Sequence, residues 1–251
     1  MTRSELARAE DAAKRATDGQ SPSALDHALS RLDIDPNDPS PVSDAEARFL
    51  FRLVRDHGCR RTLEVGCGLG KSAVAIMSAT DGPHTVIDPY QDNYGRRGIA
   101  NIDRSGLGER LVFVPELSCL ALPKLVESGA RFDFVFIDGS HRFDDVLLDF
   151  CYADLLLDSG GYVVLDDLWM RTVRLVVSFV RRNRKDYSLV SGAPRGLAVF
   201  RKTGTDRRDG MFHREFYTPR SFASHHLLVW LSSGQSPMRS AVRAIKSALL
   251  R

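Results

Sequence analysis

The sequence predicts an α/β fold built on a doubly wound sheet of seven strands. Short apolar runs alternate with amphipathic segments over residues 43–204, and this alternation is typical of successive strand–helix units in a parallel sheet. A glycine-rich turn follows the first apolar run. The last two expected strands are joined by the short segment G-A-P-R-G at 192–196. Such a loop is short enough for a hairpin, so we expect five parallel strands followed by a terminal hairpin with one antiparallel strand.

The expected strands are short runs rich in β-branched and aromatic residues, bounded by polar residues or glycine. A Gly160-Gly161 pair is expected to break the chain just before the fifth strand. The strands are predicted near 61–66, 84–88, 111–114, 132–138, 162–166, 186–190 and 196–201. Between them apolar residues recur at helical spacing. Helices are therefore predicted near 44–57, 71–79, 92–104, 118–128, 142–156 and 171–183.

Two helical extensions flank this domain. Residues 1–42 are polar and helix-prone and end in a stretch rich in Pro, Asp and Ser, whereas residues 205–251 open with a charged linker and end in an amphipathic pattern. Ser236 and Pro237 suit the start of that last helix, as a cap and a first-turn proline. We expect it to pack on the domain or to form a homo-oligomer, with a membrane surface as the alternative. The aromatic stretch 212–230 is a candidate cover for a substrate pocket.

The composition is that of an ordinary soluble globular protein, with 43% hydrophobic and 27% charged residues and a net charge of +3. This small net charge gives no reason to expect a nucleic-acid partner. Two basic clusters, at 181–185 and 201–208, are expected to be solvated surfaces. The four cysteines lack metal-ligand spacing and should be free thiols in a reducing compartment. With no signal peptide and no transmembrane segment recognisable, we expect a cytoplasmic protein.

Gly66, Gly68 and Gly70 lie between the first expected strand and the helix that follows it. Glycines at alternate positions let the backbone turn tightly and approach a ligand closely. A dinucleotide fingerprint would need a glycine where the chain has Lys71. A phosphate-binding P-loop would need one where the chain has Val65, although its G-K-S tail is present. A P-loop-like nucleotide hydrolase therefore stays an alternative.

The pattern that remains is E-x-G-x-G-x-G, beginning at Glu64, and it resembles motif I of the class I S-adenosylmethionine-dependent methyltransferases. Asp88, at the end of the second expected strand, matches the family's acidic residue that binds the ribose hydroxyls. A carboxylate suits a diol because it can accept two hydrogen bonds at once. The resemblance implies a Rossmann-like domain whose loop passes under the methionine portion of the cofactor. The residues implied in cofactor binding are Glu64, Gly66, Gly68, Gly70, Ser72, Asp88, Ser118 and Asp138.

Three aspartates, Asp88, Asp138 and Asp166, each end an expected strand. Ligands of open α/β sheets bind outside the carboxyl ends of the strands, so these side chains should converge on one crevice. For each residue taken singly, the alternative is that it caps the following helix.

Two segments carry a more specific resemblance, I-D-G-S-H at 137–141 and G-G-Y-V-V-L-D-D at 160–167. They are similar to a bacterial branch of O-methyltransferases that modify sugars and natural products, including the macrocin type. Metal-dependent relatives hold a divalent cation with three oxygen ligands at the ends of strands four and five. Mg²⁺ prefers such oxygen ligands and would relieve the repulsion between carboxylates. The metal ligands implied here are Asp138, Asp166 and Asp167.

His141 follows Asp138 by three residues, where the family places a Lys or His general base. A bound cation lowers the pKa of a hydroxyl, and an imidazole that titrates near neutrality can take its proton. We therefore expect an O-methyltransferase that acts on a sugar or small natural product, with Trp169 as a candidate pocket wall. The alternatives on the same fold are a metal-independent methyltransferase and a non-catalytic cofactor-binding protein. After the third strand, only Ser118 matches the family's Gly–acid–Ser turn, so the adenine contacts stay unassigned.

Overall fold

The computed structural model of the chain describes residues 22–214 and 216. Its sheet has seven strands in the order β3-β2-β1-β4-β5-β7-β6. The pairings among the first five strands are parallel, whereas β7 is antiparallel to β5 and to β6. The predicted doubly wound sheet with a terminal hairpin is thus confirmed. The strands are β1 (Thr62–Val65), β2 (His84–Ile87), β3 (Leu111–Val114), β4 (Phe132–Ile137), β5 (Leu157–Leu165), β6 (Tyr187–Val190) and β7 (Ala198–Lys202).

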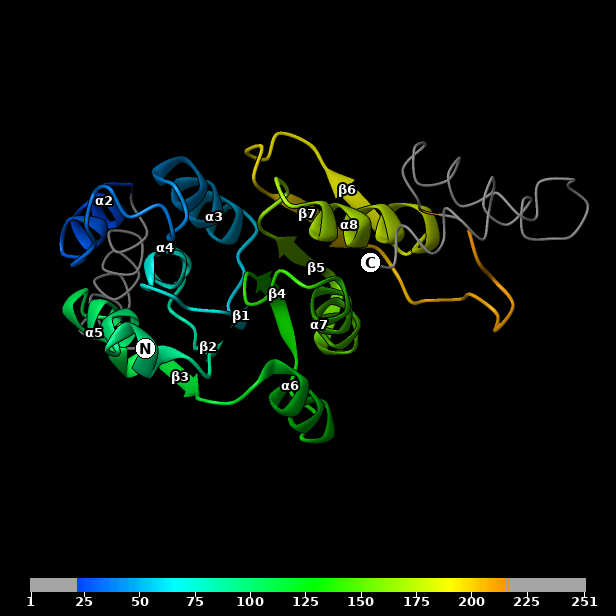
Figure 1. Cartoon of the computed structure of the whole chain (residues 1–251), viewed down its shortest axis with the longest axis horizontal. Helices are drawn as coiled ribbons and strands as arrows, with labels where there is room; N and C mark the ends of the chain where they lie inside the picture. The colour runs from blue at the N-terminus through cyan, green and yellow to red at the C-terminus, as the bar shows by residue number, and fades with distance from the viewer. Residues whose placement is uncertain (1–21, 215, 217–251) are drawn as a thin grey trace, which may run out of the picture.

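Helices cover both faces of this sheet (Figure 1). Side chains alternate along β4: Phe134 and Phe136 join an apolar cluster with α3 and α4, whereas Val135 and Ile137 join a cluster with α6, α7 and α8. Because both faces are covered, the strand reads as a nearly continuous apolar run. The helices are α2 (Pro22–Ser30), α3 (Asp44–Asp56), α4 (Lys71–Ser78), α5 (Arg97–Arg104), α6 (Ser118–Glu127), α7 (Phe143–Leu156) and α8 (Arg171–Asn183), with short 3₁₀ turns η1 (Gln91–Tyr94) and η2 (Gly108–Arg110).

The switch in strand order lies between β1 and β4. The chain starts at β1, moves outward to β3 and then returns to the other side of β1 at β4. The segments that leave β1 and β4 therefore diverge in opposite directions and open a crevice at the carboxyl end of the sheet. Both the glycine loop and Asp138 lie at this switch point.

Two predicted elements have different bounds in the structure. The helix expected over 92–104 is divided into η1 and α5, because Gly95 and Arg96 adopt left-handed φ values of 59° and 55° that end the first turn. Strand β5 begins at Leu157 instead of near 162. Its pairing with β4 shifts register between Phe132 and Phe134. The glycine pair therefore lies inside the strand as an irregularity rather than before it.

The N-terminal extension contributes to the core of the sheet domain. Leu25 and Ala28 of α2 are buried, in clusters that also contain residues of α3 and α4. The segment between α2 and α3 ends in a capping box, in which the Ser43 hydroxyl accepts from the Glu46 amide and the Glu46 carboxylate accepts from the Ser43 amide. This box fixes where α3 begins and directs the Glu46 side chain toward the crevice.

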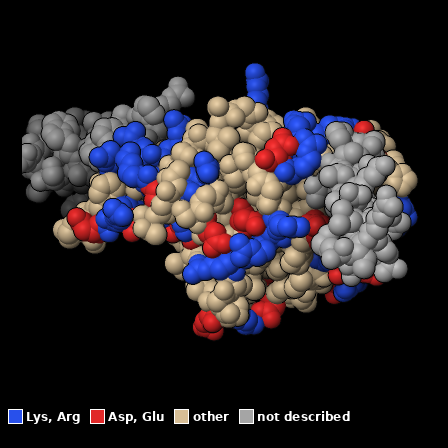
Figure 2. Space-filling view, turned by 180° about the vertical axis from the view of Figure 1, so that it is seen from behind, with Lys and Arg blue, Asp and Glu red and all other residues tan. Residues whose placement is uncertain are grey.

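Arg184 was expected in a solvated basic cluster, but its side chain is only 3% exposed. Its guanidinium bonds to Asp186 through Nε (3.0 Å) and Nη2 (2.6 Å), and Nη2 also lies 2.7 Å from Asp154. Asp206 lies 3.7 Å from Nε and joins the segment after β7 to this group. On the face seen in Figure 2, Lys and Arg side chains lie beside acidic ones at several places. Burial of Arg184 is possible because two carboxylates replace its water.

The remaining predictions on the chain's organisation have mixed outcomes. The cysteines at 59, 67, 119 and 151 are free thiols, as expected. Within residues 22–214 and 216, no helix has the length and apolar character needed to cross a membrane. The amphipathic helix expected from Ser236 onward, and most of the aromatic stretch 212–230, lie outside the described residues.

The substitution Arg184→Gln should lower the free energy of unfolding by about 3–5 kcal/mol, because it leaves the buried Asp186 carboxylate without its cation. Urea denaturation followed by circular dichroism measures this loss. Arg181→Gln, at an exposed position of the same helix, is the matched control and should stay within about 0.5 kcal/mol of the wild type. Equal effects in the two variants would contradict a structural role for the buried guanidinium.

Candidate functional site

The backbone conformation of the loop between β1 and α4 requires glycine at three positions. Gly66, Gly68 and Gly70 have φ values of 89°, 50° and 80°, a region that other residues rarely adopt. A Cβ on Gly66 would lie 2.3 Å from the carbonyl oxygen of Asp138, and one on Gly70 would lie 2.7 Å from that of Gly98. A Cβ on Gly68 would instead meet open space. The two outer glycines of the loop are therefore in close contact with the backbone at Asp138 and Gly98. The middle glycine, Gly68, has space beside it for a ligand.

Asp88 holds the loop in this shape. Its Oδ2 accepts hydrogen bonds from the amides of Cys67 (3.1 Å) and Gly68 (3.2 Å) and from Gln91 Nε2 (2.7 Å). Its Oδ1 accepts one bond, from the amide of Tyr90 at 2.8 Å. Oδ1 thus retains acceptor capacity, whereas Oδ2 is fully used by the protein. Asp88 supports the loop and still has one oxygen to offer a ligand.

Glu64 and Ser72, which the motif implies in cofactor binding, are hydrogen-bonded to each other beneath the loop. The Ser72 hydroxyl donates to Glu64 Oε1, and Glu64 Oε2 lies 2.9 Å from His84 Nε2. His84 Nδ1 in turn bonds to Thr62 Oγ1 at 2.8 Å. Glu64 and His84 are fully buried. This chain of bonds connects β1, β2 and α4, so Glu64 acts as an internal support, while Ser72 also borders the cleft.

Two cavities open beside the loop. The central cleft, of about 460 Å³, extends from Gly68 to the acidic groups at the ends of β4 and β5. The side cavity, of about 320 Å³, lies between the start of α6 and the first turns of α7 and includes the predicted residue Ser118. Gly66, Asp88, Tyr90 and Gly139 border both cavities. A long ligand could therefore cross from one cavity to the other over Gly66 and past Asp88.

The acidic cluster in the central cleft combines residues that follow β4 and β5. Asp138, His141 and Asp167 each offer a ligand atom, and these atoms lie within 4.8 Å of one another. His141 Nε2 lies 2.6 Å from Asp167 Oδ2, and the Trp169 indole donates to Asp167 Oδ1 at 2.6 Å. Asp167 adopts a left-handed φ of 59°, which aspartate tolerates better than most residues. This turn brings the Asp167 side chain back over the cleft toward His141.

Asp166, the third metal ligand that the resemblance implies, borders the cleft together with Asp138 and Asp167. Its Oδ1 accepts the Asp167 amide at 2.6 Å, and the group of mutually close ligand atoms contains His141 in its stead. Burial, together with the nearby Glu46 and Asp167 carboxylates, raises the pKa of Asp166 to about 7. Burial, Asp166 and Asp167 also raise the pKa of Asp138 well above its usual value. These carboxylates repel one another, and a cation between them would reverse both shifts.

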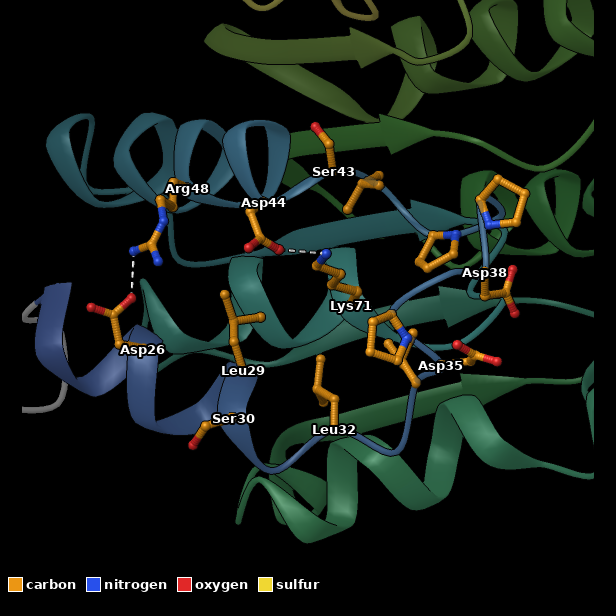
Figure 3. A pocket seen from close by; sticks show the side chains of 15 residues that line it. Asp26, Leu29, Ser30, Leu32, Asp35, Asp38, Ser43, Asp44, Arg48 and Lys71 are labelled. Atoms are coloured by element: carbon orange, nitrogen blue, oxygen red, sulfur yellow. Dashed lines mark hydrogen bonds and ion pairs between the residues drawn. The ribbon is translucent and has the colours of Figure 1, made fainter.

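Figure 3 shows a third cavity, which lies next to the central cleft and is lined by the N-terminal part of the described chain. It holds about 660 Å³ between α2, α3 and the connecting segment, and Lys71 borders both it and the cleft. In Figure 3, Lys71 points toward Asp44 and Arg48 points toward Asp26; the first pair is 2.7 Å apart. The connecting segment 39–43 borders both spaces and so forms the wall between them.

Several residues of the site were not identified from the sequence. Gln91 completes the Asp88 cluster, and Tyr90 and Tyr94 border the central cleft. Asp149 borders the side cavity and is buried, although it is an acidic residue. One signal was available for it: Asp149 falls on the same helical face as Val146, Phe150 and Ala153, which are core residues. An acidic residue on an apolar helix face is uncommon unless it has a partner.

The close approach at Gly66 allows a direct test. Gly66→Ala should lower the free energy of unfolding by more than 2 kcal/mol and displace the loop, because the new Cβ would overlap the Asp138 carbonyl and the φ of 89° would be strained. Gly129→Ala is the matched control, since its φ is 75° with open space at the Cβ position. Thermal unfolding of both variants gives the comparison. A Gly66→Ala variant no less stable than Gly129→Ala would disprove the contact.

Comparison with known proteins connects this geometry to a family. Residues 63–168 match the sequence family described as a methyltransferase domain. Tricin synthase 1 of Oryza sativa subsp. japonica is 30% identical over 143 residues, covering 52% of this chain and 54% of that protein. Caffeoyl-CoA O-methyltransferase 2 of Zea mays is 31% identical over 143 residues, covering 53% and 52%. The chain thus spans about half the length of the curated relatives it matches.

Solved structures agree in fold. The O-methyltransferase TomG of Streptomyces achromogenes, solved in complex with SAM, superposes with a TM-score of 0.58 at 23% identity, over 72% of this chain and 89% of that chain. The Bacillus cereus O-methyltransferase in complex with SAH gives 0.58 at 20% identity, over 72% and 92%. The family match covers the glycine loop, Asp88, Asp138 and the Asp166-Asp167 pair together. Residues 63–168 are therefore similar to a methyltransferase domain, and the fold is that of the solved O-methyltransferases.

Proposed function

We propose that the protein is an S-adenosylmethionine-dependent O-methyltransferase that methylates a hydroxyl of a sugar or small natural product with the help of a divalent cation. One observation carries the proposal: the glycine loop and the cluster of Asp138, His141 and Asp167 border the same cleft. A methyl donor on the loop would therefore lie beside groups that can hold and deprotonate a hydroxyl. The plant and bacterial relatives named above, whose names describe O-methyltransferases, support this reading.

The cofactor would extend through the two connected cavities, with its methionine end in the central cleft and its adenine end in the side cavity. Its methionine end would lie in the central cleft over Gly68, where a Cβ would meet open space. Its ribose would pass Asp88, whose Oδ1 can accept a further hydrogen bond. Its adenine would enter the side cavity, which Ser118 borders. This orientation leaves the part of the cleft near Trp169 and the segment 39–43 for the acceptor.

The donor set fits a hard divalent cation such as Mg²⁺. Asp138 and Asp167 offer carboxylate oxygens, and the Asp166 carboxylate lies next to Asp167 in the sequence. Mg²⁺ is bound by one or two carboxylates plus water or substrate oxygens, and the three aspartates provide at least that number. When bound, the cation would polarise the acceptor hydroxyl and lower its pKa. Binding of the cation would relieve the mutual repulsion of the carboxylates.

The protein's own residues would align the groups and move the proton. In methyl transfer, the acceptor oxygen forms a bond to the methyl carbon while the carbon–sulfur bond breaks, and the sulfur keeps the electron pair. His141 would accept the hydroxyl proton. Its Nε2 faces Asp167 at 2.6 Å, which leaves Nδ1 as the basic nitrogen and lets Asp167 stabilise the imidazolium that forms. The cleft contributes mainly by holding the two reactants in line.

A metal-independent methyltransferase is the second candidate. The close His141–Asp167 pair favours it, because these two residues alone form a base with its orienting carboxylate. The two candidates differ in the response to chelators: the first loses turnover in EDTA, and the second does not.

The metal assignment can be tested without an acceptor. Asp138→Asn should weaken Mn²⁺ binding, measured by electron paramagnetic resonance of the free ion, by more than tenfold, because it removes a charged ligand from the cluster. S-adenosylhomocysteine binding by calorimetry should change less. Asp158→Asn, at the opposite end of β5, is the control and should leave both affinities unchanged. Undiminished Mn²⁺ affinity in Asp138→Asn would refute the proposed site.

The role of His141 can be tested by kinetics. His141→Gln should lower kcat by about 10²–10⁴-fold, since general-base catalysis contributes about that much, while the cofactor Kd should stay within about threefold. The acceptor can be found by screening radiolabelled methyl transfer to phenols and glycosides. His27→Gln, at an exposed site in α2, is the control. If Mn²⁺ affinity fell together with kcat, His141 would be a ligand instead of the base.

A further inference from the structure

Among residues 22–214 and 216, one buried carboxylate of the side cavity has no partner that meets hydrogen-bond geometry. Asp149, in α7, is 1% exposed, and neither of its oxygens has a hydrogen-bond partner in the part of the chain that the structure describes. Burial raises the pKa of Asp149 to about 6, with Asp145 acting in the same direction and the nearby Ser118 hydroxyl acting against it. Above that pH the side chain carries a charge in a place with little water. Buried polar groups without partners are rare in native proteins and costly to stability.

Asp88 and Asp145, the other carboxylates that border the cavity, already accept hydrogen bonds from the protein. Asp145, one helical turn earlier, accepts from the Ser140 hydroxyl at 2.7 Å and from Arg142 Nε at 2.8 Å. Glu116, which follows β3, lies 2.6 Å from Lys124. Within the described residues, no partner meets hydrogen-bond geometry at Asp149, and the only group that acts on it as a donor is the nearby Ser118 hydroxyl. Both side chains border the cavity, so a ligand there would compete only with Ser118 for the Asp149 oxygens. An apolar residue would pack better at this position of the core, and folding therefore does not explain the aspartate.

The walls of the side cavity suit a flat heterocycle. Leu117 and Leu148 border it together with Asp149 and Ser118. The cavity joins the central cleft at Gly66 and Asp88, where the ribose of the cofactor would lie. A purine that extends from that ribose would lie among the leucines, with its polar edge toward Asp149. An ionised carboxylate can only accept hydrogen bonds, so it suits an amino group and repels a carbonyl oxygen.

We propose that Asp149 accepts a hydrogen bond from the 6-amino group of the cofactor's adenine and thereby makes the protein select adenine over a 6-oxo purine. This inference rests on the proposed binding of S-adenosylmethionine, and it assigns the base-recognising contact to a residue of α7. Asp149 touches the cofactor far from the methyl group, so it determines specificity and takes no part in the chemistry.

Calorimetric titration with S-adenosylhomocysteine and S-inosylhomocysteine at pH 7.5 tests the assignment. The wild type should bind the adenine ligand at least tenfold more tightly, because the 6-oxo group faces a carboxylate. Asp149→Asn should reduce this preference to less than threefold, since an amide can rotate to donate to an oxo group or accept from an amino group. Asp149→Ala should weaken adenine binding and also lose the preference. Asp144→Asn, an exposed site in α7 that borders neither cavity, should behave as the wild type.

The outcomes separate this inference from the function on which it rests. If the wild type bound neither ligand, the proposed cofactor would be wrong and the assignment of Asp149 would fail with it. If the wild type preferred adenine and Asp149→Asn kept the full preference, the assignment alone would be overturned. Thermal unfolding gives an independent measurement: at pH 7.5 Asp149→Asn should melt no lower than the wild type, because it removes an unpaired buried charge. A lower melting temperature would mean that Asp149 is bonded within the protein, which would also overturn the inference.

Discussion

The close approach of the loop at Gly66 to the end of β4 is the constraint on which the site depends. The Gly66 Cα faces the carbonyl of Asp138 with no room for a side chain, so the backbone fixes the glycine loop and Asp138 to each other. Asp88 adds a second connection by holding two amides of the same loop. The distance between the proposed cofactor and the cluster at His141 is therefore set by the sheet, with no flexible side chain between them.

Most of the fold could be predicted because its strands are short apolar runs separated by clear helical periods. The differences arise where local backbone conformation overrides the pattern. Gly95 and Arg96 end a turn within one amphipathic segment, and apolar periodicity does not record a left-handed φ. The glycine pair at 160–161 looks like a break, yet hydrogen bonding with β4 carries the strand through it. The burial of Arg184 could not be predicted for a similar reason: Asp186 is close to it in the sequence, but only the fold brings Asp154 to it.

The site could be predicted in outline, because residues at the carboxyl ends of parallel strands must meet. Asp88, Asp138 and Asp166, each of which ends a predicted strand, border the same cleft for this reason. The directions of side chains could not be read from the sequence. Glu64 lies in the motif but points beneath the loop to Ser72 and His84, and Asp166 turns to the next backbone amide. Asp149 was missed because it belongs to a helix, where its apolar neighbours make it look like part of an ordinary amphipathic face.

The wall formed by residues 39–43 belongs to no strand of the sheet. The part of the cleft at the glycine loop is built from loops that the sheet holds in place, whereas the part proposed for the acceptor is closed by a connecting segment with a cavity on its other side. The side-chain hydrogen bonds of this wall run to Asp38 and Glu46, and Glu46 connects it to the acidic groups of the cleft. In the proposed function, substitutions at residues 39–42 would change which acceptor binds, whereas a substitution at Ser43 would also alter the charge balance of the cleft.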